Sequence, residues 1–208
     1  MLDRNRFMIK ERIAIIRTTD TYDIFDPESE EKIGQASEVP GKLVALLRWV
    51  VNKNFMPTRV EVRSENDDRL LFYIRRGWYI FRAKVRVYDA NDELIGWFRS
   101  KILTIAGAFQ VYDKNDELFA QIKGGRRWFF DYHLKTPDGI EIGSVTKKFG
   151  GVLKELFTSS DAFLVTVAED FEEQKSAKIL LLAAALAIDI IFKEDQSAGI
   201  DSVPSLGN

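Results

Sequence analysis

The sequence contains no cysteine and only one histidine, and both absences exclude whole classes of chemistry. Without cysteine there can be no disulfide, thiolate nucleophile, cysteine-bound zinc or palmitoyl anchor. With His133 alone, neither a histidine-based metal centre nor a Ser-His-Asp triad can be built. Phosphate-binding loops and dinucleotide fingerprints are also missing, because the glycines do not cluster in those spacings. The sequence therefore predicts a protein that is not an enzyme.

A strong excess of either charge is missing as well. The formal net charge of the 208 residues is -2, which favours no nucleic-acid partner. Residues 1–12 carry charges but no apolar core of a signal peptide, so a cytoplasmic location is expected, with peripheral contact to the membrane. Hydrophobic residues make up 46% and charged residues 30% of the chain, a balance typical of a folded globular protein.

The longest apolar stretch, residues 179–192, is apolar on every side of a helical wheel, with Asp189 as its single charge. A helix of this kind must be enclosed. Crossing a bilayer takes about 20 apolar residues, so we expect a buried core helix and no transmembrane span. Asp189 is then a buried polar residue on the central helix, where it meets an arginine, a lysine or backbone N–H groups at the rim of the fold. The alternative is a proton or ligand contact inside the fold.

From residue 58 to residue 144 the apolar residues alternate with polar ones, as in antiparallel strands that cover a core on one face. Two near copies, VYDANDELIGWF and VYDKNDELFAQI, begin at Val87 and Val111, 24 residues apart, and LKTPDGIEIGSV at Leu134 is a looser third copy. Each has an Asp/Asn/Gly turn between apolar runs and is predicted to be a hairpin. Other expected elements are strands at 7–17 and 163–167, a hairpin at 22–38, a turn at 64–68, an amphipathic helix at 39–55 and a strand or helical turn at 152–157.

Together these elements predict a mainly β fold, a closed antiparallel barrel of about twelve strands around the C-terminal helix. Closure leaves no open sheet edge, and the helix fills an interior that side chains alone would not. We expect one domain over residues 1–194 and a disordered polar tail over residues 195–208.

Three features resemble the phospholipid scramblase and LURP-one-related families of the tubby C-terminal-like superfamily. They are YDIFDPESEEKIG, the repeated hairpins, and LFTSSDAF followed by an acidic spacer and LAAALAIDIIFKE. The resemblance extends from about Phe7 to Glu194 and implies a twelve-stranded barrel around the helix. It also implies contact with phospholipid or phosphoinositide headgroups.

The chain departs from scramblases in lacking a proline-rich N-terminal region and acylated cysteines. Their proposed calcium segment corresponds to residues 159–170, where Asp161 and Asp170 are the candidate ligands. Apolar Phe163 and Val165 stand where oxygen ligands are required. We therefore expect no metal ion and no cofactor.

Basic side chains alternate with apolar ones on several predicted strands, and Arg75-Arg76 lies on a neighbouring strand. The candidate lipid-binding residues are Arg82, Lys84, Arg86, Arg99, Lys101, Arg126 and Arg127. If these residues meet, they form a cationic patch suited to anionic phospholipid; an ordinary solvated exterior is the alternative.

The leading functional hypothesis is a non-enzymatic module that binds anionic phospholipid or phosphoinositide at the membrane surface. The alternative is a soluble intracellular protein-interaction or scaffold domain with no lipid-moving activity. The sequence does not predict an oligomeric state.

Overall fold

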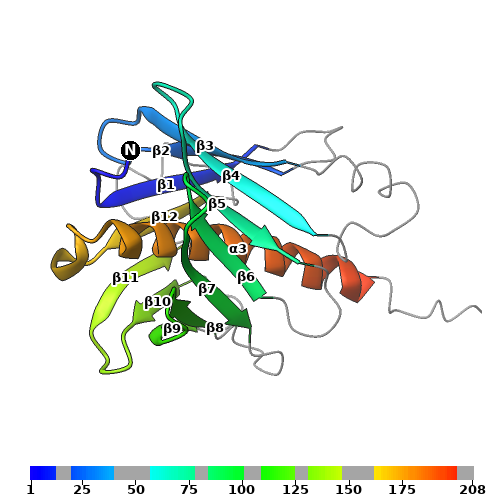
Figure 1. Ribbon diagram of the computed structural model, residues 1–208. Coiled ribbons are helices and arrows are strands. Elements are labelled where there is room, and N and C mark those ends of the chain that lie inside the picture. Colours follow the sequence, from blue (N-terminus) through cyan, green and yellow to red (C-terminus); the bar gives the residue numbers. More distant parts are fainter. Residues whose placement is uncertain are drawn as a thin grey trace, which may run out of the picture.

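A closed antiparallel barrel surrounds one helix in the computed structural model, which describes residues 1–12, 20–39, 57–77, 84–100, 109–124, 131–146 and 162–200 (Figure 1). Each strand pairs with the next along the chain, and β12 closes the sheet onto β1, where Arg6 lies opposite Thr166. The predicted fold class is confirmed. The strands are β1 Arg6–Glu11, β2 Thr21–Phe25, β3 Lys32–Glu38, β4 Thr58–Ser64, β5 Leu70–Arg76, β6 Lys84–Asp89, β7 Leu94–Ser100, β8 Phe109–Asp113, β9 Leu118–Gly124, β10 Asp131–Lys135, β11 Glu141–Thr146 and β12 Ala162–Val167.

Five hairpins of the barrel share two features of their turns. Each has one residue with positive φ in its turn and an irregularity of register just before it. This is the combination of a left-handed residue and a bulge that short hairpin loops favour. The positive-φ residues are Glu30, Asp68, Asp92, Asp116 and Gly139. The predicted hairpins are therefore confirmed, and the sequence repeat is a repeat of turn geometry.

Aspartates at the start of three of these turns, Asp26, Asp89 and Asp113, hold them closed. The Asp89 carboxylate accepts hydrogen bonds from the backbone N–H groups of Asn91 and Glu93, at 2.8 and 2.9 Å. Asp113 makes the same two bonds to Asn115 and Glu117 in the next hairpin. Such local bonds to a backbone two to four residues on are the reason that aspartate favours turns. They explain why the repeated motif keeps its aspartates.

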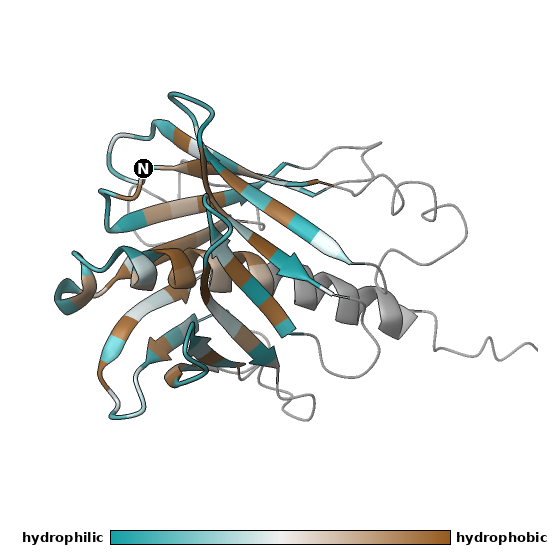
Figure 2. Cartoon of the chain, viewed as in Figure 1, coloured by the Kyte–Doolittle hydropathy of each residue, from teal (hydrophilic) through white to brown (hydrophobic). Residues whose placement is uncertain are grey.

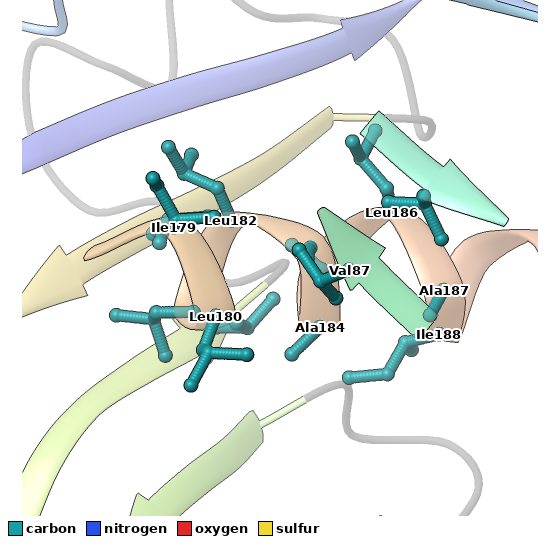
Figure 3. Close-up of a cluster of buried hydrophobic side chains, with 14 of the residues drawn as sticks. Val87, Ile179, Leu180, Leu182, Ala184, Leu186, Ala187 and Ile188 are labelled. Atoms are coloured by element: carbon teal, nitrogen blue, oxygen red, sulfur yellow. The ribbon is translucent and has the colours of Figure 1, made fainter. Parts of the chain in front are cut away.

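Helix α3, Lys175–Ile200, fills the barrel. Every residue from Ile179 to Ile188 is at most 5% exposed, on all sides of the helix (Figure 3). The strands present alternate apolar residues to it, seen as brown bands in Figure 2, and Val87 of β6 is one of them. The predicted central helix is thus confirmed over these residues.

Some predicted elements lie outside the described residues. The predicted helix at 39–55 does so except for Val39, as does the whole of the segment 152–157. Strand β1 is shorter than the predicted 7–17, of which residues 13–17 are not described. Helix α3 continues to Ile200, so it includes the first part of the segment expected to be a disordered tail. Residues 194–198, EDQSA, contain no proline or glycine that would end the helix earlier.

Candidate functional site

Four basic side chains lie on the outer surface of three consecutive strands, and we call them the basic face: Arg75 of β5, Lys84 and Arg86 of β6, and Arg99 of β7. In the strand register Arg75 is opposite Arg86, and Lys84 is opposite Arg99. Residues paired in this way have Cβ atoms about 4.5–5.5 Å apart. Three of the side chains are exposed and Arg99 is half-buried. The register therefore brings the four cations together on one patch of surface.

Alternation along the strands aims these side chains outward. Val85 and Val87 of β6 are buried in the core, so Lys84 and Arg86, one position away, face solvent. Alternation also explains Arg76, which follows the exposed Arg75 on β5: it points into the barrel and is only 4% exposed. Only the first residue of the Arg75-Arg76 pair thus belongs to the basic face.

The basic face lacks the carboxylate partners that other basic residues have. Arg12, just after β1, and Lys32 of β3 both contact Asp23, at 2.6 and 3.2 Å. On β4, Arg59 and Arg63 both bond Glu61, each at 2.9 Å. Within the part of the chain that the structure describes, no residue of the basic face makes an ion pair. Like charges directly opposite each other in a sheet are destabilising. The four cations therefore form an uncompensated positive patch.

Asp23 shows what pairing does on the other side of the barrel. Burial raises the pKa of its carboxyl, but hydrogen bonds from Arg12 and Lys32 outweigh burial and hold the pKa below its usual value. Lys32 also bonds Glu65 at 2.8 Å, so the charges there compensate one another. That group is a structural ion-pair network, unlike the basic face.

Trp97 lies beside the basic face, on β7 opposite Arg86. Its ring stacks on Tyr112, with centroids 4.1 Å apart and planes 6° from parallel. The ammonium nitrogen of Lys84 lies 3.8 Å from the centroid of the Trp97 ring. The indole N–H donates a hydrogen bond of 2.7 Å to the Asp116 carboxylate. The tryptophan is consequently only 7% exposed, although it is on an outward-facing position.

The same arrangement occurs one hairpin earlier, 24 residues back along the chain (97 to 73). The Tyr73 ring stacks on Tyr88 with centroids 5.0 Å apart, and the Arg59 guanidinium lies 3.8 Å from the Tyr73 centroid. The Tyr73 hydroxyl donates to Asp92 at 2.9 Å. Burial first, and then this bond to Asp92, raise the pKa of Tyr73. The two copies differ in their cation, because Arg59 is bonded to Glu61 whereas Lys84 has no carboxylate partner among the described residues.

Of the predicted lipid-binding residues, the structure brings together Lys84, Arg86 and Arg99. Four others lie outside the described residues, namely Arg82, Lys101, Arg126 and Arg127. The aromatic residues of this surface were not predicted from the sequence. A signal was available, since Tyr73 and Trp97 interrupt the polar positions of their strands at the repeat spacing.

The other predicted positions lie away from this face. Asp189 belongs to α3, but its side chain is outside the described part of the structure, so its burial and pairing remain a prediction. Asp161 is also outside, and Asp170 is exposed on the short 3-10 helix η2, Glu169–Phe171. Phe163 and Val165 are core residues of β12, so these two positions of the calcium segment cannot supply ligands. In the part of the chain that is described, no three His, Asp or Glu side chains are grouped to hold a metal ion.

Comparison with protein families decides the relationship. Residues 16–195, most of the chain, match the model of the family described as Scramblase. The chain belongs to the scramblase family. Comparison with curated proteins and with solved structures gives no match. Membership supports a scramblase-related, lipid-associated role, and domains of this family are not classical enzymes. Among the described residues, no helix has a stretch long and apolar enough to cross a bilayer.

Proposed function

We propose that this scramblase-family domain binds anionic phospholipid or phosphoinositide headgroups through the basic face, without catalysing a chemical reaction. The observation that carries the proposal is that the four basic residues lie opposite one another in two pairs, Arg75 with Arg86 and Lys84 with Arg99. None of the four has a carboxylate partner among the described residues. An anion between them would remove the mutual repulsion of the cations. The domain would act peripherally, at the cytoplasmic leaflet, whose surface potential is negative.

The chemistry of the side chains suits a phosphate ligand. Arg75, Arg86 and Arg99 present planar guanidinium groups that can bind phosphate oxygens in pairs, and Lys84 adds a compact charge. Each basic residue near an anionic membrane contributes about 1 kcal/mol. Four residues therefore contribute roughly 4 kcal/mol, or about a thousandfold in affinity. That amount supports reversible binding that salt weakens.

A scaffold function would favour an aromatic surface without basic neighbours. Trp97, on which Tyr112 stacks, instead contacts Lys84 and lies opposite Arg86. No specific observation therefore favours the protein-interaction alternative.

The test is co-sedimentation with vesicles of phosphatidylcholine and increasing phosphatidylserine at low salt. The variant K84Q/R99Q removes two charges from the basic face, and we expect it to bind about 30-fold more weakly than wild type. The matched control is R69Q/K114Q, which removes two charges from exposed hairpin turns and should bind like wild type. A wild-type protein that does not bind anionic vesicles at low salt would refute the proposal and leave the scaffold alternative.

A further inference from the structure

We propose that Trp97 is the positioning residue of the basic face, holding the ammonium group of Lys84 where a lipid phosphate meets it. The inference rests on the proposed function and names the point at which the headgroup is bound. Lys84 and Arg99, which are opposite each other on β6 and β7, supply the contacts to phosphate. Trp97 acts through Lys84 and does not itself bind the ligand.

The Trp97 ring is fixed from three directions. Tyr112 covers one part of it by stacking, Asp116 holds the indole N–H, and Lys84 lies against the ring. Asp116 is itself set in the hairpin turn, where its positive φ belongs to the repeated turn geometry. The ring is thus held by β7, which carries it, by Tyr112 of β8 and by Asp116 of the turn that follows β8. A ring held in this way is a fixed platform for a cation.

Contact with the ring changes what Lys84 can do. A lysine on a surface strand normally samples many rotamers, and ordering such a side chain at an interface costs about 0.5–1.5 kcal/mol. Attraction to the face of an indole restricts the ammonium group before any ligand arrives. The ring carries no net charge, and Lys84 remains exposed, so its full positive charge stays available to an anion. Lys84 is therefore pre-organised without being neutralised.

The earlier copy of the arrangement supplies an internal comparison. Arg59 lies over Tyr73 at the same 3.8 Å, but it donates to Glu61, which also accepts from Arg63. Its charge is already compensated within the barrel. Two cation–aromatic contacts occur among the described residues. Only the cation at Trp97, Lys84, has no carboxylate partner there and can therefore bind an external anion. The Tyr73 copy is thus the matched structural control for Trp97.

The experiment is a double-mutant cycle read by binding to vesicles with about 30% phosphatidylserine, a content chosen to give the membrane a negative surface potential. W97L should weaken binding about 2- to 10-fold, the factor that corresponds to ordering one lysine side chain. The same substitution in a K84Q background should have no further effect, because Trp97 acts through Lys84. Y73L should leave vesicle binding unchanged.

A second measurement uses the wild-type protein, so its result does not depend on whether a variant folds. The proton resonance of the Lys84 ε-methylene should be shifted upfield by the Trp97 ring, and added phosphatidylserine vesicles should perturb it. A Lys84 resonance at its ordinary position would overturn the inference. So would vesicle binding that K84Q weakens while W97L leaves it unchanged; the proposed function would survive that result. Failure of the wild type to bind anionic vesicles would overturn both.

Discussion

Replacing Gly143 by alanine probes how closely the central helix approaches the barrel wall. Gly143 lies on β11 opposite Val167 of β12. A Cβ atom at this position would lie 2.5 Å from Cδ2 of Leu181 and closer still to the carbonyl oxygen of Thr166. Leu181 is 1% exposed and enclosed by the core. The Thr166 oxygen belongs to the backbone of a paired strand, so neither neighbour can move freely.

The expected cost follows from these contacts. Inserting one methyl group into a packed core destabilises by about 1–3 kcal/mol. Because a backbone atom is one of the two obstacles, we expect the upper end, about 3 kcal/mol. For a domain of this size each kcal/mol shifts Tm by about 2–4 °C, so Gly143→Ala should lower Tm by about 6–12 °C.

Gly77 provides the control. No heavy atom lies within 4 Å of a Cβ placed there, and its φ is not positive. Gly77→Ala should therefore stabilise by about 0.4–1 kcal/mol, through the lower entropy of the unfolded chain. Thermal unfolding followed by circular dichroism compares the two variants. If Gly143→Ala unfolds at the same temperature as Gly77→Ala, the close contact between α3 and β11 is wrong.

Two further predictions concern the core and the ion pairs. Leu182→Lys places a charge at a position that is 0% exposed and should prevent soluble folding, whereas Leu182→Met should cost less than about 1.5 kcal/mol; equal solubility of the two would contradict a buried helix. The pKa of Asp23 is lowered in the folded state, so its contribution is present above the unfolded value of about 3.9 and is lost as pH falls through the folded value. Urea unfolding between about pH 5 and pH 2 should show a steeper loss of stability for wild type than for Asp23→Asn, and parallel curves would refute this assignment.

The fold could be predicted from the sequence because its signals are local. The aspartates of the repeated turns, such as Asp89 and Asp113, form bonds within four residues, so each hairpin is determined by its own sequence. A meander of hairpins leaves few alternatives for strand order, and an all-apolar helix must be enclosed. The extension of α3 to Ile200 was missed because polar composition alone does not end a helix.

The candidate site depends on register, which the sequence determines less directly. Irregularities at Val87/Tyr88 and Val111/Tyr112 shift the pairing near each turn. A change of one residue in register would move every facing side chain to the other surface of its strand. Whether Lys84 lies opposite Arg99 therefore depends on the irregularity at Val87/Tyr88 in their own hairpin. Basic residues could be identified on the strands, but their opposition and the stacking around Trp97 could not.

The packing of α3 also limits how this domain can act on lipid. Between Ile179 and Ile188 the helix buries six large apolar side chains in addition to its alanines. Exposing each large side chain costs about 1.5–3 kcal/mol, so removing the helix from the barrel would cost roughly 9–18 kcal/mol. A folded domain is stable by only about 5–15 kcal/mol in total. A lipid path through the barrel would therefore cost about as much as the whole stability of the domain. Under the proposed function, contact with headgroups is made on the outer surface instead. The exposed side chains of the basic face, such as Lys84, lie on that surface and can reach an anion without any change in the core.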